Sequence, residues 1–172
     1  RVMNDRLSAL LRGGRTERRA LARDPSSPVA ALADSLADDL APWLMAGAPI
    51  PLQKARLTRF GGRCPTHGIF LEFDPAKPSH HWCVRCQRAY EGREHDDWWA
   101  MGAQLWTAER AVHAAALFVL RDDPRHAQFA AHILRDYADR YDTWPNRDNV
   151  LGPTRPFFST YLESIWLLNL CH

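Results

Sequence analysis

Apolar residues recur at helical spacing in the first fifty residues and again after residue 94, while the segment between them follows a different pattern. In the first part, the periodicity predicts a helix that begins after Ser26 or Ser27 and ends at Gly47. Its apolar positions are Val29, Leu32, Leu36, Leu40, Trp43 and Leu44. A shorter helix is predicted over residues 2–11. The arginine-rich residues 12–23 fit a solvated helical face or a basic binding patch, and we favour the first.

Three helices are predicted for the last part of the chain. The first begins near His95 and ends where RDDPR (residues 121–125) interrupts it, and the second follows directly, so the two form an antiparallel helical hairpin. Residues 143–156 are dense in Pro, Gly and Asn and predict a loop. The third helix, from about Phe157, is apolar nearly all round, which predicts burial by more than one neighbour. Because the sequence stops within that pattern, we expect further helices after residue 172.

The segment between the helical parts carries prolines, glycines and short runs typical of strands. Strands are predicted over residues 69–73 (IFLEF), 80–83 (HHWC) and 88–90 (RAY). The sequence therefore predicts three parts: a helical lead-in over 1–50, a small β insertion over 51–93, and helical hairpins over 94–172. The fold class is mainly α.

The insertion contains a C-x-x-H and a C-x-x-C motif, made of Cys64, His67, Cys83 and Cys86. Two such knuckles aim four sulfur and nitrogen ligands at one point, which suits tetrahedral zinc. With all four positions occupied by protein, the site would be structural. Gly68 follows the first knuckle, where a turn with positive φ is expected.

The sequence leaves other interpretations of these residues open. Two cysteines could form a disulfide, or all could be unbound thiols. The metal could be catalytic with His80 or His81 taking part, and His81 could replace His67 as the fourth ligand. Cys171 lies on an apolar helix and is predicted to be a buried small hydrophobe.

The composition of the chain limits which kinds of partner and location are expected. Twenty-two Lys and Arg against 20 Asp and Glu give a net charge of +2, which offers no reason to invoke nucleic acid. The longest apolar run, residues 114–120, is too short to span a bilayer. Reduced thiols on zinc favour a cytoplasmic location, with a periplasmic or secreted one left open.

Three stretches, in order, resemble the N-terminal half of heparinase II/III-like polysaccharide lyases and alginate-lyase-like relatives. They are the cysteine segment CPTHGIFLEFDPAKPSHHWCVRCQRAYEGREHDDWW, the hairpin AAALFVLRDDPRHAQFAAHILRDYADRY, and GPTRPFFSTYLESIWLL. The last matches the family pattern at Phe158, Thr160, Glu163, Trp166 and Leu167, and departs from it at Ser159 and Tyr161. The resemblance covers about Pro51 to the end.

The resemblance implies an incomplete (α/α) toroid with a zinc-ribbon-like β insertion, and β-elimination on a uronate-containing polysaccharide. It also implies that the catalytic Asn, His and Tyr lie on later helices, followed by a β-domain. None of these residues is assigned here, so this chain alone is expected to be inactive.

For this chain, we still expect residues that line the substrate-binding site. Arg155 could clamp a substrate carboxylate in a bidentate fork. The other candidates are Tyr161, Glu163, Trp144 and Arg147, with Asn146 beside them. Structural roles stay open: Arg155 could pair with Glu163 or Asp148, and Glu163 could cap the helix with Thr160.

The alternative hypothesis comes from another functional class: the chain is a zinc-ribbon module that binds a protein or nucleic acid without catalysis. Residues 63–93 carry five basic side chains that support it. Acidic side chains in and just after that segment cancel the charge, which weakens nucleic acid as the partner.

Overall fold

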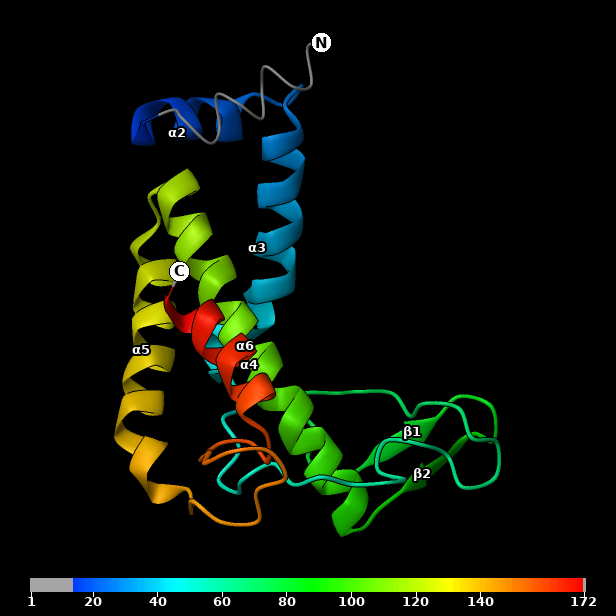
Figure 1. The fold of residues 1–172 in the computed structure, drawn as a ribbon. Helices are drawn as coiled ribbons and strands as arrows, with labels where there is room; N and C mark the ends of the chain where they lie inside the picture. The colour runs from blue at the N-terminus through cyan, green and yellow to red at the C-terminus, as the bar shows by residue number, and fades with distance from the viewer. Residues whose placement is uncertain (1–13, 172) are drawn as a thin grey trace. The chain divides into compact units, whose positions relative to one another are not determined.

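The computed structural model describes residues 14–171, so the helix predicted over 2–11 lies outside the described residues. The described part is mainly helical, with a single two-stranded sheet (Figure 1). The helices are α2 (Arg15–Arg23), α3 (Pro28–Ala46), α4 (Arg93–Arg121), α5 (Pro124–Arg140) and α6 (Thr160–Cys171), with a 3₁₀ turn η1 (Tyr141–Thr143). The strands are β1 (His81–Cys83) and β2 (Arg88–Tyr90). Among these residues, no helix combines the length and the apolar character needed to cross a membrane.

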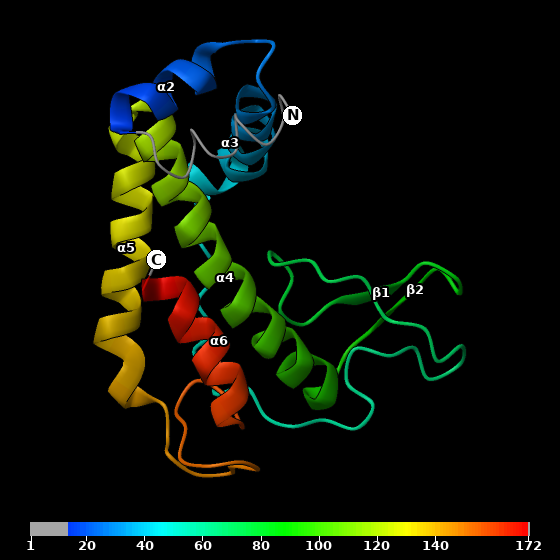
Figure 2. The ribbon, with the colours of Figure 1, turned by 45° about the horizontal axis from the view of Figure 1, so that its top comes forward.

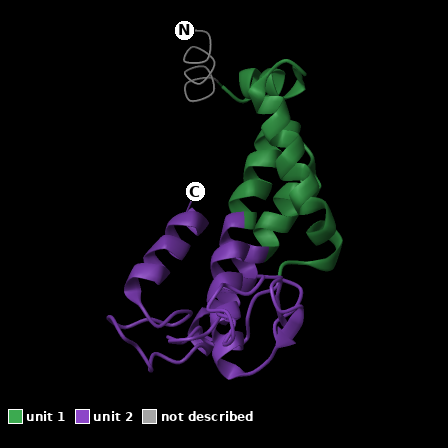
Figure 3. Ribbon diagram, turned by 90° about the vertical axis from the view of Figure 1, so that its right-hand side faces the viewer, with its two compact units in different colours: residues 1–48, 110–132 green, residues 49–109, 133–172 purple. Residues whose placement is uncertain are grey.

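The chain divides into two compact units, coloured separately in Figure 3. The first unit contains the described residues up to 48 together with 110–132. The second contains residues 49–109 and the residues from 133 onward. Helices α4 and α5 each contribute to both units, whereas the cysteine segment and α6 belong wholly to the second.

Helix α3 in the first unit begins and ends at the predicted residues. The Ser27 hydroxyl accepts a hydrogen bond from the Val29 amide at 3.2 Å, and Pro28 fills the first helical position. Gly47 ends the helix with φ +79°, a conformation in which only glycine is unstrained. Of the arginine-rich stretch, the structure describes residues 14–23. Helix α2 buries none of its residues, and Arg19 pairs with Asp122.

The break predicted at RDDPR is confirmed. Only Asp122 and Asp123 separate α4 from α5, and Asp122 adopts φ +61°. The Asp123 carboxylate accepts a hydrogen bond from the Arg125 amide at 3.0 Å, so it caps the start of α5. Away from the break, the Tyr137 hydroxyl of α5 donates to the Gln104 carbonyl of α4 at 3.2 Å. Helix α5 therefore folds back beside α4, as the predicted hairpin requires.

The two strands flanking the second cysteine pair are confirmed, but the predicted strand over 69–73 is wrong. β1 and β2 pair antiparallel, with Trp82 opposite Ala89. Residues 69–73 make only an isolated bridge, from Phe70 to Arg63. The reason is that this segment bonds to a different neighbour on each side: the Leu71 amide to the Gly62 carbonyl and the Glu72 amide to the Trp82 carbonyl, both at 2.8 Å. One bridge to residues 62–64 on one side and one hydrogen bond to Trp82 on the other build no ladder.

Helix α6 is less buried than its sequence predicts. Figure 2 shows it beside the last turns of α5, where Trp166 packs edge-on against Tyr137 with ring centroids 4.9 Å apart. Within the described residues, Trp166 is the buried side chain of this helix, while Tyr161, Leu167 and Leu168 are exposed. The described residues therefore leave several apolar side chains of α6 uncovered, and the further covering neighbours stay a prediction. Cys171, predicted to be buried, is exposed as well.

Candidate metal centre

Two chain reversals of the same design bring the four predicted ligands together. In the first, the Gly68 amide bonds to the Cys64 carbonyl at 2.8 Å, and Gly68 has φ +66°. In the second, the Gln87 amide bonds to the Cys83 carbonyl at 2.9 Å, and Gln87 has φ +50°. Each reversal directs the two side chains of its motif to the same side. The predicted positive φ at Gly68 is confirmed, whereas nothing in the sequence marked Gln87.

The ligand atoms of Cys64, His67, Cys83 and Cys86 all lie within 4.8 Å of one another, so the cluster could hold a metal ion. The Cys64 and Cys86 sulfurs are 3.7 Å apart, and His67 Nδ1 lies 3.6 Å from Cys64 Sγ and 4.0 Å from Cys83 Sγ. Ligands at the corners of a tetrahedron around zinc are spaced by about 3.5–3.8 Å, given Zn–S and Zn–N bonds of about 2.3 and 2.0 Å. A disulfide would need about 2.05 Å between sulfurs. The spacing fits a metal tetrahedron and excludes a bond between these sulfurs.

Tyr90 supports the cluster from outside it. Its hydroxyl lies 3.5 Å from Cys64 Sγ and 3.4 Å from Cys86 Sγ. Hydrogen bonding to the Cys64 and Cys86 sulfurs raises the pKa of Tyr90 to about 12. Burial opposes ionisation of the Cys64 thiol, but the hydrogen bonds from Tyr90 and neighbouring groups outweigh it and lower its pKa to about 5. This shift favours a thiolate at Cys64, which is the form that binds metal. The Tyr90 hydrogen bond lowers the pKa of Cys86 as well, but burial and the neighbouring sulfurs outweigh it and raise that pKa.

An apolar shell surrounds the ligands. Leu71 is buried with Cys64 and Cys83, and Ile69, Tyr90 and Trp98 pack against them. Gly62 comes so close to the Trp98 indole that a Cβ there would lie 2.3 Å from it. Such a shell shields Cys64 and Cys83 from water, whereas His67 and Cys86 are half-buried.

The alternative ligand His81 has another partner. It is buried, and its Nε2 lies 2.9 Å from Asp96 Oδ1 in the first turn of α4. His80 is exposed and is not among the clustered ligands. The structure therefore gathers the set with His67, and the two neighbouring histidines stay outside it.

Three of the predicted substrate residues meet near the start of α6. The Arg155 guanidinium donates to the Trp144 carbonyl at 3.0 Å and pairs with Asp142 at 3.3 Å. Glu163 accepts from the Arg155 amide at 3.0 Å and from the Tyr141 hydroxyl at 2.6 Å. That hydrogen bond to Glu163 raises the pKa of Tyr141 to about 12. Glu163 thus holds the loop to the helix instead of capping Thr160, and Asp142, not Asp148, pairs with the Arg155 side chain.

The other predicted residues are arranged differently. Trp144 is buried, and its indole nitrogen donates to the Leu52 carbonyl at 3.1 Å, so it is a core residue and offers no face to a sugar. Tyr161 and Arg147 are exposed and do not join the Arg155 cluster. Asn146 binds within its own loop, where its carbonyl oxygen accepts from the Asn149 side chain and the Thr154 amide.

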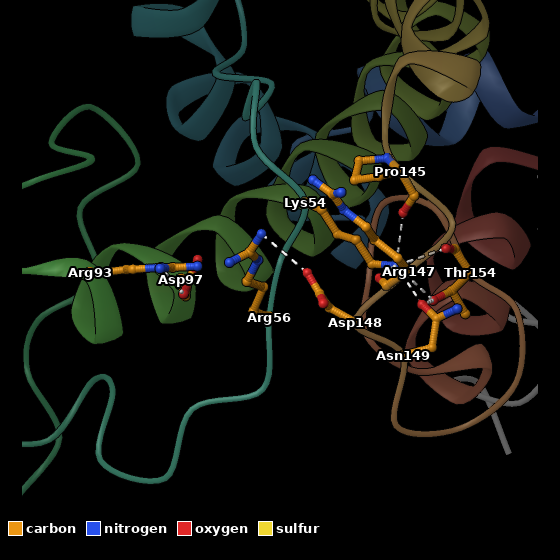
Figure 4. Close-up of polar contacts among 9 residues, drawn as sticks. All are labelled: Lys54, Arg56, Arg93, Asp97, Pro145, Arg147, Asp148, Asn149 and Thr154. Atoms are coloured by element: carbon orange, nitrogen blue, oxygen red, sulfur yellow. Dashed lines mark hydrogen bonds and ion pairs between the residues drawn. The ribbon is translucent and has the colours of Figure 1, made fainter.

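Sequence reasoning missed Lys54, which holds the loop over residues 145–154 (Figure 4). This side chain is 3% exposed, and its ammonium donates to the carbonyls of Arg147 and Thr154 at 2.8 Å each and of Pro145 at 3.2 Å. It also contacts the Asn149 side chain. Burial lowers the pKa of Lys54. The one available signal was composition, because Lys54 is one of two lysines in an arginine-rich chain.

A polar pocket lies next to Lys54. Arg56, Arg93, Asp96 and Asp97 contribute charged side chains to it, and Leu52 and Pro145 contribute apolar ones. Arg56 pairs with Asp148 at 3.2 Å, and Arg93 approaches Asp97 at 3.7 Å (Figure 4). Burial raises the pKa of Asp97. A pocket with both charge signs and a perturbed carboxyl group is the kind of place where polar ligands bind.

No protein-family model matches this sequence, and no significant match was found among curated proteins or among solved structures.

Proposed function

We propose that the cluster of Cys64, His67, Cys83 and Cys86 holds one structural zinc ion. The observation that carries this proposal is the spacing of the four ligand atoms, together with their apolar surroundings. Three sulfurs and one imidazole nitrogen are ligands that zinc prefers. Four protein ligands leave no open position for water or substrate, so the ion's role is to hold the fold.

The ion would stabilise a segment that has little regular structure of its own. Two strands of three residues each bury too little to be stable alone. The contacts of this segment with α4 include the pair of His81 and Asp96 and a hydrogen bond from the Trp99 indole nitrogen to the Asp74 carbonyl at 2.8 Å. Zinc binding is therefore expected to order the segment and, through it, the start of α4.

The test is metal analysis of protein purified without added metal. We expect one zinc per chain, and cobalt exchanged into the site should show the intense charge-transfer bands of thiolate ligands. Cys83→Ser should lose the metal, while Cys171→Ser, at the cysteine outside the cluster, should keep it. Metal-free folded protein, or a cobalt spectrum without thiolate bands, would overturn the proposal.

We also propose that this chain is the zinc-bearing helical part of a polysaccharide lyase that acts by β-elimination on uronate-containing glycans. This proposal is supported by the order of the three stretches that resemble the family. Two of these stretches lie on the α4–α5 hairpin and on α6. In this proposal, those helices belong to an (α/α) toroid and the cysteine segment is its zinc-ribbon-like insertion. Elimination requires a group that neutralises the uronate carboxylate as charge spreads from C5.

Arg155 is the residue of this chain proposed for that carboxylate. Its side chain is 32% exposed, and its direction is set by the Trp144 carbonyl and by Asp142. Glu163 positions the Arg155 backbone. This arrangement leaves part of the guanidinium open to a ligand, since only some of its five N–H groups are engaged.

The test is an assay of the intact gene product on uronate polysaccharides, followed by ultraviolet absorbance of unsaturated products. Arg155→Gln should lower kcat/KM by about 100-fold, in line with the loss of one strong electrostatic contact in the transition state. Arg135→Gln, at an exposed arginine of α5, serves as the control. If no unsaturated product forms from any uronate polymer, the lyase proposal fails, whatever the zinc content.

A further inference from the structure

A hollow on the outer side of the cysteine segment is lined by an aromatic ring and four polar side chains. They are Trp82, Glu72, Asp74, Lys77 and His80. All seven tryptophans lie in the described part of the chain, and Trp82, at 37% exposure, is the most exposed of them. This indole keeps more than a third of its surface open beside polar side chains, so it can contact a ligand that enters the hollow.

The strand geometry fixes the indole in this position. Trp82 stands between His81 and Cys83, which are both buried, so alternation along β1 turns the indole outward. Its cross-strand partner is Ala89, whose single methyl group can cover little of a ring. Part of the ring therefore remains open to solvent while β1 is anchored by the cysteine cluster.

The polar rim is held by main-chain contacts. The Glu72 amide donates to the Trp82 carbonyl at 2.8 Å, which sets Glu72 beside the indole. Asp74 accepts from the Ala76 amide at 2.9 Å and pairs with Lys77 at 3.0 Å, and the Lys77 hydrogen bond keeps its pKa low. The Asp74 carbonyl in turn accepts from the Trp99 indole. Within the described residues, the side chains of Glu72 and His80 have no partner, so they are free to bind a ligand.

We propose that this hollow binds a neutral pyranose sugar. The C–H face of a pyranose ring can lie on the indole, and its hydroxyls can donate to Glu72 and Asp74 and accept from Lys77. Two carboxylates against one ammonium give the rim a negative charge, which repels a uronate carboxylate. The hollow thus differs in ligand from Arg155, and the inference does not rest on elimination chemistry.

The test uses the zinc-loaded chain labelled with ¹⁵N, with the Trp82 indole resonance assigned by comparison with Trp82→Phe. Cellotetraose, mannotetraose and chitotetraose are the neutral probes, and tetragalacturonate is the charged one. We expect at least one neutral tetrasaccharide to shift the Trp82 signal saturably, with a dissociation constant on the order of 1 mM. Tetragalacturonate should bind at least tenfold more weakly.

The variants separate the hollow from the rest of the segment. Trp82→Ala should weaken binding at least tenfold, as read from the remaining shifted amides. Phe70→Ala removes another exposed aromatic ring of the same segment, one that lies under Arg63 and outside the hollow, and should bind as the wild type does. Zinc content measured on each sample keeps this result separate from the metal proposal.

Four outcomes would overturn the inference: no shift from any neutral sugar in zinc-loaded protein, binding of tetragalacturonate as tight as that of the neutral probes, unchanged binding in Trp82→Ala, or tighter binding of a tetra-arginine peptide than of every sugar. The last would assign the hollow to a cationic protein segment instead.

Discussion

The imidazole Nε2 of His81 lies 2.9 Å from Oδ1 of Asp96, and this contact joins β1 to the first turn of α4. His81 is 1% exposed, and its ring also packs near those of His95 and Trp98. Asp96 is well placed, because the start of a helix favours a carboxylate. The cysteine segment and α4 therefore share this polar contact in addition to the Trp99–Asp74 hydrogen bond and their apolar packing.

Replacing Asp96 should destabilise the protein by leaving a buried imidazole N–H without a partner. Asp96→Ala is expected to lower the free energy of unfolding by about 1–3 kcal/mol, the usual cost of an unsatisfied buried donor. Denaturant titration of zinc-loaded protein measures this. Glu94→Ala, at an exposed carboxylate in the same turn, is the matched control, and an equal loss in both variants would contradict a special role for the pair.

Lys54 should matter far more for stability than the other lysine. Lys54→Met leaves several buried carbonyl oxygens of the 145–154 loop without a donor, and we expect a loss of about 3 kcal/mol. Lys77→Met removes only a surface pair with Asp74, for which less than about 1 kcal/mol is expected. Thermal and denaturant midpoints of the two variants test the contrast. Similar losses would mean that the loop does not depend on the Lys54 ammonium.

The features predicted correctly from the sequence are those set by a few neighbouring residues. Ser27 and Gly47 bound α3 because a cap and a left-handed residue act within one helical turn. The four ligands of the metal cluster were found from their spacing, because each motif closes its own turn. The break between α4 and α5 follows from Pro124 and its aspartates.

The misses involve contacts between residues far apart in the chain. Lys54 bonds to carbonyls about ninety or more residues away, and no local pattern indicates that a backbone will need a cation. Residues 69–73 carry a strand-like pattern, but regular pairing also depends on neighbours that the pattern does not show. The apolar residues of α6 predicted burial, yet apolar character does not say which covering elements are present.

Two glycines in left-handed conformations should respond differently to substitution by alanine. At Gly68, with φ +66° and open space around the Cβ position, we expect a loss of about 1–2 kcal/mol from backbone strain alone. At Gly62, with φ +74°, the new methyl group would also lie 2.3 Å from the Trp98 indole. Trp98 is fixed by edge-on packing with Phe73 and His81, so it cannot easily move away. Gly62→Ala should therefore cost at least twice as much, as measured by denaturant unfolding with zinc present. Equal losses would show that Trp98 yields.

Tyr90 should tune zinc affinity without being a ligand. Tyr90→Phe removes the hydroxyl that contacts the Cys64 and Cys86 sulfurs, and we expect zinc affinity to fall about 10–100-fold, as is usual for such supporting groups. Competition with a chelator measures the change. Thr66→Val is the matched control because Thr66 contacts the Tyr90 hydroxyl at 3.4 Å but is not part of the metal cluster. Unchanged affinity in Tyr90→Phe would show that the contact to sulfur has no energetic weight.

His126 on α5 should make stability in its own unit depend on pH. It is buried, and burial lowers its pKa below the ordinary 6.5, assisted by Arg125 and Arg121, although Asp123 partly opposes the shift. A group whose pKa is lower in the folded state binds more protons when unfolded. Its contribution to stability is therefore fully present above about pH 6.5 and is lost as the pH falls through the folded-state pKa. Histidine side-chain NMR should show His126 titrating below 6.5, and His126→Gln should flatten the dependence of the unfolding midpoint between pH 7 and 5. His132→Gln, at an exposed position on the same helix, should leave the His126 titration as it is. A midpoint above 6.5 for His126 would mean that the charge of Asp123 outweighs burial, and stability would then rise as the pH falls.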